Sequence, residues 1–199
     1  MVSTVLVTGF EPFNNASSNP SHAVVKRLNE LGISDLYFEV LPVEFGESAR
    51  RLIRRIDEVK PDVVIALGQA EGRTQVTPER VAINVDDARI ADNAGQMPID
   101  QPISKDGYNA YFSTLPIKEI VAEINAANIP AAVSSSAGTF VCNHLFYHLQ
   151  WHCLNKGIKS GFIHLPLMDS QAHEFPGLPT LPLHELVKAV EIAITVSRR

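Results

Sequence analysis

Short apolar runs alternate with amphipathic segments along most of this chain, and the alternation restricts the fold more than any other feature of the sequence. The apolar runs have the length of buried strands and lie at residues 5–8, 37–41, 63–67 and 161–165. The amphipathic segments repeat apolar residues at helical spacing and lie at residues 20–31, 49–59, 117–127, 140–156 and 183–196. Strands that alternate with helices are typical of α/β proteins. We therefore expect a three-layer α/β/α sandwich with a mainly parallel (mixed) central sheet.

Some local signals refine this outline. Asn19 followed by Pro20 predicts the start of a helix, with Asn19 as its N-cap. Residues 69–114 are less regular, although residues 81–85 have the pattern of a strand, so we expect extra and partly antiparallel strands there. Residues 129–134 form one more short apolar run, which predicts another strand.

The composition predicts one globular domain that spans residues 1–199, because 45% of the residues are hydrophobic and can form a sizeable core. The net charge of −5 argues against a nucleic-acid partner. No apolar run approaches the ~20 residues of a membrane span, and the N-terminus does not resemble a signal peptide, so we expect no membrane partner. Two cysteines are too few for a disulfide scaffold, so we expect free thiols and a cytoplasmic location.

In sheets of this kind, ligands bind beyond the carboxyl ends of the strands. The loops expected at that edge lie at residues 9–19, 68–80, 134–143 and 164–170. Chemistry is therefore expected from side chains in these four segments.

Cys142 is the first candidate, since it follows the small-residue turn at 134–138 and falls in the first turn of the next predicted helix. A cysteine at a helix N-terminus can have a pKa well below about 8.5, and the unpaired backbone N–H groups there can hold an oxyanion. From position alone, a buried packing cysteine is the alternative. Cys153 lies roughly 16 Å further along the same helix, which excludes a disulfide with Cys142, and we expect it in the core.

His164 ends a buried strand, which places it at the carboxyl edge of the sheet beside Cys142. A cysteine nucleophile needs such a base nearby, although a hydrogen-bonded core histidine has the same pattern. Glu79, in an otherwise apolar stretch, could orient an imidazole or form a surface ion pair with Arg80. Arg89 could meet a carbonyl oxygen or pair with the acids that precede it.

Other motifs indicate which cofactors and ligands to expect. His144, His148 and His152 recur every four residues, but the glutamate of the metalloprotease pattern and a third ligand are missing, so we expect no metal. No glycine-rich phosphate loop is present, so we expect no nucleotide cofactor. Phe10 and Phe13 suit a flat apolar ligand and could equally cap the core.

Taken together, five segments resemble the pyroglutamyl peptidase I (pyrrolidone carboxyl peptidase) family of cysteine peptidases over nearly the whole chain. They are residues 7–13 (VTGFEPF), 68–84, 86–89 (DDAR), 134–143 and 161–164 (GFIH). The resemblance implies an α/β sandwich, commonly assembled as a homotetramer, that needs no cofactor and acts on peptides with an N-terminal pyroglutamate.

The resemblance also implies roles for individual residues. Glu79, Cys142 and His164 correspond to the family's catalytic triad, and Arg89 to an arginine near the oxyanion hole. The segments that form the family's pyroglutamate pocket hold Phe10, Phe13, Asn19, Gln69, Phe140 and Val141.

The chain departs from the family's pattern in two places. Asn14 and Asn15 replace the glycines usual after the VTGFEPF segment, and Glu71 stands where a small residue or proline is usual. The first hypothesis is a cysteine exopeptidase that hydrolyses the amide bond after an N-terminal pyroglutamyl residue through a thioester. The alternatives are a binding module that keeps the pocket without turnover, and a metal-dependent amidase that uses the histidine-rich helix.

Overall fold

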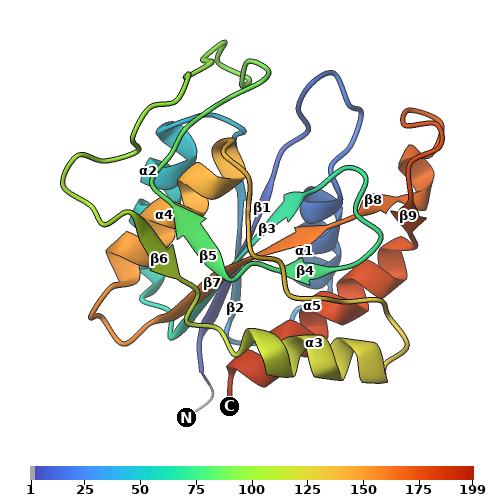
Figure 1. Ribbon diagram of the computed structural model, residues 1–199. Helices are drawn as coiled ribbons and strands as arrows, with labels where there is room; N and C mark the ends of the chain where they lie inside the picture. The colour runs from blue at the N-terminus through green and yellow to red at the C-terminus, as the bar shows by residue number, and fades with distance from the viewer. Residues whose placement is uncertain (1–2) are drawn as a thin grey trace.

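A five-stranded mixed sheet forms the centre of the computed structural model, which describes residues 3–199 (Figure 1). Strands β1 (Val5–Phe10), β2 (Leu36–Leu41), β3 (Val63–Gln69) and β7 (Lys159–Leu165) run parallel to one another. The short strand β4 (Thr77–Pro78) lies antiparallel to β7, and the strand order is β2-β1-β3-β7-β4. The predicted mainly parallel but mixed sheet is thereby confirmed.

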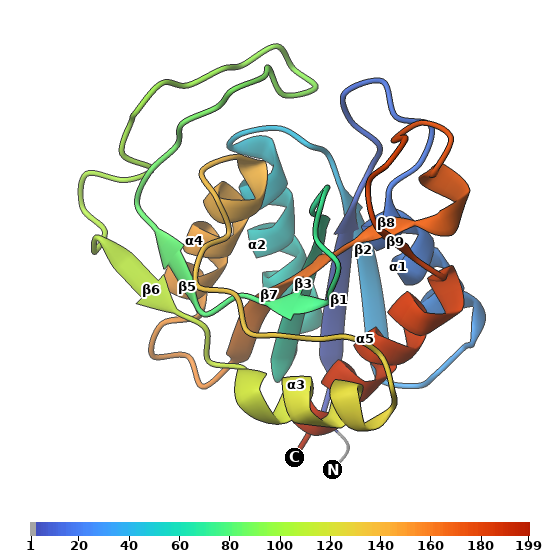
Figure 2. The ribbon, with the colours of Figure 1, turned by 45° about the vertical axis from the view of Figure 1, so that its right-hand side comes forward.

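Five helices cover the two faces of the sheet, as Figures 1 and 2 show. On one face lie α1 (Pro20–Glu30), α3 (Ile117–Ala126) and α5 (Leu183–Ser197), which share a hydrophobic cluster with the sheet. On the other face lie α2 (Glu47–Val59) and α4 (Val141–Cys153), which pack on each other over a second cluster. Two cores on opposite faces of one sheet make the predicted three-layer sandwich.

Smaller elements complete the chain outside the main sheet. Strands β5 (Val81–Ile83) and β6 (Ala110–Phe112) pair antiparallel, and β8 (Leu167–Met168) pairs with β9 (Thr180–Leu181). A 3-10 turn, η1 (Asp169–Gln171), follows β8. The irregular segment 69–114 therefore adds antiparallel pairing, as expected, but β5 and β6 form a separate ribbon.

The strand expected at residues 129–134 does not form. This segment makes only isolated bridges, from Ala131 to Val76 and from Ser134 to Glu79. The run instead lies parallel to residues 76–80, along the outer edge of β4, and makes backbone hydrogen bonds to them within the connection between α3 and α4.

Helices α1 and α4 begin differently. Asn19 caps α1 as expected, because its Oδ1 accepts a hydrogen bond from the Ser21 N–H at 2.9 Å. Helix α4 begins after Phe140, whose side chain accepts no capping hydrogen bond. The first N–H groups of α4 are thus left without the side-chain partner that helix starts usually have.

Within residues 3–199, none of the helices is both long enough and apolar enough to cross a lipid bilayer.

Candidate active site

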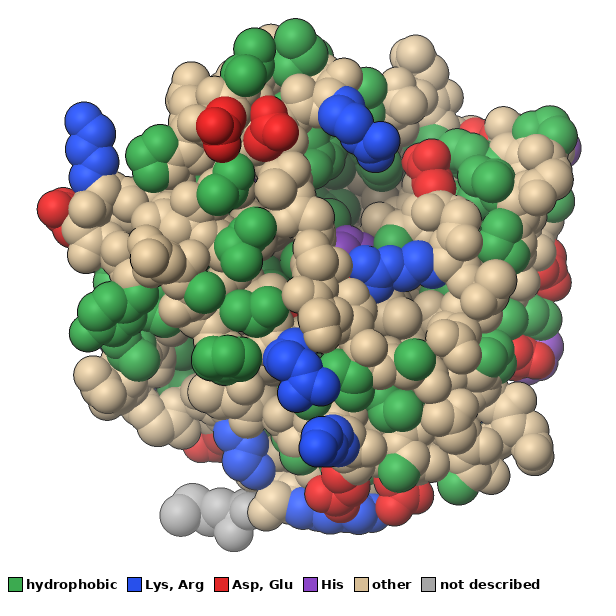
Figure 3. Space-filling view, viewed as in Figure 1, with side chains coloured by type: hydrophobic (Ala, Val, Ile, Leu, Met, Phe, Trp, Pro, Cys, Tyr) green, Lys and Arg blue, Asp and Glu red, His purple; other side chains and the backbone are tan. Residues whose placement is uncertain are grey.

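A cavity of about 780 Å³ opens at the carboxyl edge of the sheet. In the space-filling view a hollow with a histidine at its base and cationic side chains beside it opens toward the viewer (Figure 3). The four loops expected at this edge all contribute to the wall. Of the candidate site residues, all line the cavity except Glu79, which lies behind His164: Phe10, Phe13, Asn19, Gln69, Arg89, Phe140, Val141, Cys142 and His164.

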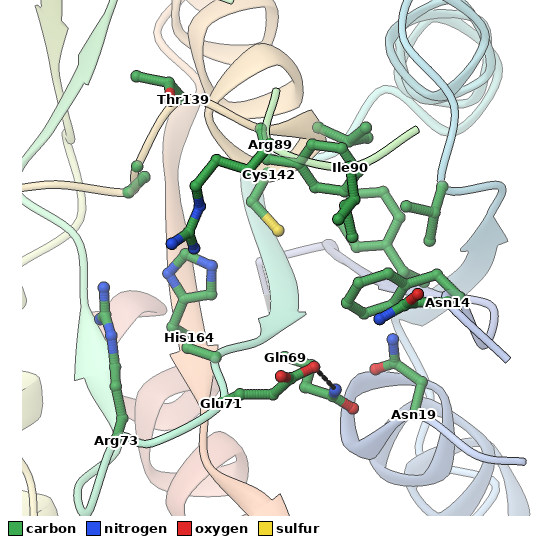
Figure 4. A pocket seen from close by; sticks show the side chains of 18 of the residues that line it. Asn14, Asn19, Gln69, Glu71, Arg73, Arg89, Ile90, Thr139, Cys142 and His164 are labelled. Atoms are coloured by element: carbon green, nitrogen blue, oxygen red, sulfur yellow. Dashed lines mark hydrogen bonds between the residues drawn. The ribbon is translucent and has the colours of Figure 1, made fainter. Parts of the chain in front are cut away.

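Gly68 brings the thiol and the imidazole together. It lies opposite His164 in the parallel register of β3 and β7. A Cβ atom at position 68 would come within 2.9 Å of Cys142 Sγ and 2.7 Å of Phe162 Cζ. Both distances are shorter than real Cβ contacts, so a side chain at position 68 would force Cys142 and Phe162 to shift. The Sγ of Cys142 therefore reaches over the end of β3 toward the neighbouring strand that carries His164, as Figure 4 shows.

His164 and Glu79 form a buried hydrogen-bonded pair. The Nδ1 of His164 lies 2.8 Å from Oε1 of Glu79, and the two residues are 4% and 0% exposed. Since a carboxylate can only accept, Nδ1 carries the proton and Nε2 is the nitrogen left for the cavity. The surface ion pair between Glu79 and Arg80, the alternative in the sequence, does not form.

A different arginine, Arg73, reaches Glu79. Its Nη1 donates to Glu79 Oε1 at 2.7 Å and also contacts the Thr77 hydroxyl, while Nη2 donates to the Ser136 carbonyl at 3.1 Å. No sequence pattern singled out this residue, because it lies in the irregular segment after β3, where no periodicity predicts which way a side chain points. The only signal was that it precedes Glu79 by six residues across a turn.

Electrostatics keep the histidine neutral and the glutamate ionised. Burial lowers the pKa of His164 below its ordinary value, and the positive charge of Arg73 adds to this, while the hydrogen bond and charge of Glu79 oppose it. Burial alone would raise the pKa of Glu79, but the hydrogen bond and charge of His164, together with Arg73, outweigh it and lower that pKa. At neutral pH the pair is therefore a carboxylate and a neutral imidazole that can accept a proton.

The low pKa expected for the Cys142 thiol is wrong. Burial raises the pKa of the thiol to about 12, with the charge of Glu79 adding to the rise and that of Arg73 opposing it. Cys142 does lie in the first turn of α4, but a helix terminus stabilises an anion by at most about 2 kcal/mol, roughly one and a half pKa units. The effect of desolvation on the pKa is larger than that of the helix terminus, so the thiol is protonated at neutral pH.

The start of α4 and Arg89 border the space beside Cys142. The backbone N–H groups of Val141, Cys142 and Asn143 precede the first intrahelical bond, which His144 makes to the Phe140 carbonyl. The guanidinium of Arg89 extends from the loop after β5 toward the opening above His164 (Figure 4). Within residues 3–199 the structure gives Arg89 no ion pair, so it does not pair with the acids that precede it.

The polar candidates on the opposite wall are fixed by their own hydrogen bonds. Asn19 uses Oδ1 to cap α1 and donates through Nδ2 to the Glu11 carbonyl at 3.2 Å. Gln69 accepts from Gln171 Nε2 at 3.1 Å and donates to Glu71 Oε1 at 3.2 Å. The direction of the Gln69 amide is thereby set by its neighbours before any ligand arrives.

Aromatic and apolar residues form the remaining walls. The ring of Phe140 packs 6.2 Å from that of Phe13 and edge-on against Phe45 at 5.4 Å, while Phe10 and Val141 are fully buried behind them. Asn14 and Asn15 have φ angles of 51° and 60°, in the left-handed region that asparagine tolerates better than most residues. The two asparagines thus adopt a backbone conformation that glycine also favours.

The histidine-rich face of α4 is engaged in other contacts. His144 Nδ1 bonds Asp86 Oδ2 at 2.8 Å, and its Nε2 accepts from the Gly46 N–H at 3.0 Å. His152 bonds Asp57, and the His148 ring packs against that of His144. Across the part of the chain that the structure describes, no three His, Cys, Asp or Glu residues gather as metal ligands would.

A thiol in the first turn of a helix, beside a neutral imidazole held by a buried carboxylate, defines the class of cysteine-type hydrolases. Comparisons with known proteins are more specific. The family model described as pyroglutamyl peptidase matches residues 3–199. This chain belongs to the pyroglutamyl peptidase family, and the resemblance noted in the sequence is confirmed.

Relatives agree with this assignment over more than nine-tenths of their length. The chain is 52% identical to pyrrolidone-carboxylate peptidase 1 of Ralstonia nicotianae, with 98% of this chain and 93% of the relative covered. It is 49% identical to pyrrolidone-carboxylate peptidase of Yersinia pseudotuberculosis, with 97% and 92% covered. The crystal structure of pyroglutamyl peptidase I from Bacillus amyloliquefaciens matches with a TM-score of 0.95 at 46% identity, covering 100% of this chain and 96% of that one.

Proposed function

We propose that Cys142 is the nucleophile, His164 the general base and acid, and Glu79 the group that orients His164 in the hydrolysis of N-terminal pyroglutamyl peptides. The chain is a cysteine peptidase of the pyroglutamyl peptidase family, whose members remove N-terminal pyroglutamate. The observation that carries the residue roles is the buried 2.8 Å bond between His164 Nδ1 and Glu79 Oε1, at a cavity wall shared with Cys142.

The resting charges favour a proton transfer that accompanies attack. As the Sγ of Cys142 bonds to the pyroglutamyl carbonyl carbon, the thiol proton passes to Nε2 of His164. The resulting imidazolium is stabilised by the ionised Glu79 and then gives its proton to the leaving amine as the amide bond breaks. A water molecule, deprotonated by His164, next attacks the thioester carbon, which releases pyroglutamate and restores the thiol.

The negative charge on the carbonyl oxygen needs donors during both steps. The uncapped N–H groups at the start of α4 are the nearest candidates, because they have no partner within the helix and lie next to Cys142. Arg89, without an ion pair in residues 3–199 and on the same cavity wall, adds a positive charge that can approach this oxygen.

The pocket suits a small uncharged lactam. Phe13 and Phe140 supply flat apolar walls with Phe10 packed behind them, whereas Asn19 and Gln69 supply amide groups of fixed direction. A pocket that hydrogen-bonds a particular ring rejects analogues that lack the matching groups, because its buried polar atoms would then go unpaired. We therefore expect proline, which has no lactam oxygen, to be excluded.

We also propose that residues 1–199 act as one catalytic domain, since a single family model spans residues 3–199. Assembly as a homotetramer and a cytoplasmic location rest on the resemblance and on the two free thiols. Size-exclusion chromatography with light scattering tests the first, and cell fractionation the second.

The test of the residue roles compares wild type with Cys142→Ala on a fluorogenic pyroglutamyl amide and on the matching prolyl amide. We expect cleavage of the pyroglutamyl compound alone, and a loss of kcat of at least about a thousandfold in Cys142→Ala. Cys153→Ala is the matched control, because Cys153 lies in the same helix but in the core. It should keep near wild-type activity.

Other outcomes would discriminate the alternatives. A folded wild type that binds but does not cleave the pyroglutamyl amide would indicate a binding module. Activity that disappears on chelation would indicate a metal-dependent amidase. Turnover by Cys142→Ala at the wild-type rate would refute the nucleophile.

A further inference from the structure

Arg73 occupies a position at the site that neither the sequence pattern nor the roles proposed above use. Its guanidinium shares one carboxylate oxygen, Glu79 Oε1, with the imidazole of His164, at 2.7 and 2.8 Å respectively. Its other nitrogen holds the Ser136 carbonyl at 3.1 Å, in the turn that leads into the helix of Cys142. One side chain thus connects the carboxylate behind the base with the segment that carries the nucleophile.

The ion pair between Arg73 and Glu79 matters energetically because the carboxylate is buried. Glu79 has no exposed surface, whereas the side chain of Arg73 is 26% exposed and lines the cavity. A carboxylate buried beside a neutral imidazole needs a second partner to stay ionised, since an uncompensated buried charge is costly. Arg73 is the positively charged group that the structure places on it.

We propose that Arg73 is a positioning residue of the peptidase reaction, which holds Glu79 in line with His164 and sets the pH range in which His164 can act as a base. This proposal rests on the function proposed above. Arg73 acts through Glu79 and through its charge, and it does not take part in bond making.

The direction of its electrostatic effect follows from the geometry. A cation next to the pair disfavours a second positive charge on the imidazole, so Arg73 lowers the pKa of His164. The same charge favours the thiolate and opposes the burial that raises the pKa of Cys142. Without Arg73, Glu79 would hold a proton on His164 more strongly, and both reactive groups would stay protonated to higher pH.

Other charges share the cavity but are placed differently. Glu71, Asp87 and Arg89 line its walls, and within residues 3–199 none of them bonds His164, Glu79 or Cys142. Arg80 directly follows Glu79 in the chain, is only partly buried, and makes no ion pair among the described residues. Arg80 is therefore a matched control for the loss of one arginine near Glu79.

The experiment measures pH profiles of kcat/KM on the pyroglutamyl amide for wild type, Arg73→Met, Arg73→Lys and Arg80→Met. For Arg73→Met we expect kcat to fall about tenfold or more and the acidic limb to move up by about 0.5–1 pH unit. Arg73→Lys keeps the charge but loses the two-nitrogen contact, so its limb should stay at the wild-type position while kcat falls severalfold. Arg80→Met should match wild type in both.

A second readout needs no turnover. The rate of Cys142 alkylation by iodoacetamide, followed against pH by mass spectrometry, should shift to higher pH in Arg73→Met and not in Arg80→Met. An alkylation profile that shifts while wild type cleaves no pyroglutamyl amide would support the role of Arg73 and refute the proposed substrate.

The proposal is overturned if Arg73→Met loses rate with both profiles unshifted, since a merely structural role has that result. It is also overturned if Arg73→Met behaves as Arg80→Met does. If Arg73→Met does not fold, as judged by thermal melting, Arg73→Lys decides alone. An unchanged kcat in Arg73→Lys would then refute the proposal. An acidic limb that moves up in Arg73→Lys by the shift of about 0.5–1 pH unit expected for Arg73→Met would also refute it.

Discussion

Two buried histidine–carboxylate pairs lie within the described residues 3–199, and they differ in what the second ring nitrogen does. His164 bonds Glu79 through Nδ1 at 2.8 Å, and His144 bonds Asp86 through Nδ1 at the same distance. Both histidines are almost fully buried, at 4% and 6% exposure. By pairing distance and burial alone, the two would be equal candidates for a general base.

The second ring nitrogen, Nε2, distinguishes the two histidines. Nε2 of His144 accepts the Gly46 N–H, so both of its nitrogens are occupied by the protein, and the residue joins α4 to the loops before α2 and after β5. Nε2 of His164 has no such partner in residues 3–199 and lies on a cavity wall with Cys142. A carboxylate orients a histidine in either case, but of the two only His164 has its second ring nitrogen open toward a cavity that also holds a cysteine thiol, as the role proposed for it requires.

The largest expected effect comes from the matched substitutions His164→Gln and His144→Gln. Loss of the base should lower kcat/KM by about 10²–10⁴-fold with little change in stability. His144→Gln should keep activity within about tenfold but lower the free energy of unfolding by about 1–3 kcal/mol, because the ring's two contacts cannot both be replaced. Activity assays and urea unfolding measure the two. The distinction between the two histidines is refuted if His144→Gln is as inactive as His164→Gln while remaining folded.

A smaller effect is expected from the carboxylates. Glu79→Gln should lower kcat by about 10–100-fold, since the imidazolium formed during attack loses its counter-charge. Glu79 raises the pKa of His164, so its removal should also move the acidic limb of the pH profile downward, opposite to the shift expected for Arg73→Met. Asp86→Asn should leave the limb at the wild-type pH. A shift in Asp86→Asn equal to that of Glu79→Gln would mean that both pairs control the same proton.

The smallest effect concerns His148, a partly buried histidine with no carboxylate partner in the described chain. Burial, with His144 adding to it, lowers its pKa from 6.5 to about 4. The unfolded state therefore binds more protons between pH 6.5 and pH 4, and stability should fall as the pH decreases through this range, by about 2 kcal/mol after allowance for partial exposure. Urea unfolding at several pH values measures this. His148→Gln should flatten the dependence, and an unchanged slope would assign it to other groups.

The parts of the fold that follow local rules were predictable from the sequence. Apolar runs of strand length became β1, β3 and β7, and the Asn19 cap begins α1 as its residue type predicts. Because parallel strands share one carboxyl edge, the meeting of the four loops there was also predictable. The proximity of Cys142 and His164 follows from the same rule.

The remaining features of the fold and of the site depend on contacts between residues that are distant in the sequence. Arg73 and Asp86 find their partners through loops without periodicity, and the strand expected at 129–134 is reduced to isolated bridges. The pKa of Cys142 was predicted in the wrong direction, because a helix position can be read from sequence whereas the burial of one thiol cannot. Desolvation is a property of the assembled cavity.

The absent side chain of Gly68 has a consequence for how this protein tolerates mutation. Alanine is usually the mildest replacement for glycine, yet at this position one methyl group would overlap both the sulfur of Cys142 and the ring of Phe162. An inventory of functional residues that counts only reactive side chains would omit position 68. A survey of every single substitution should nevertheless find lower activity for replacements at position 68, since any added side chain would displace the sulfur of Cys142 or the ring of Phe162.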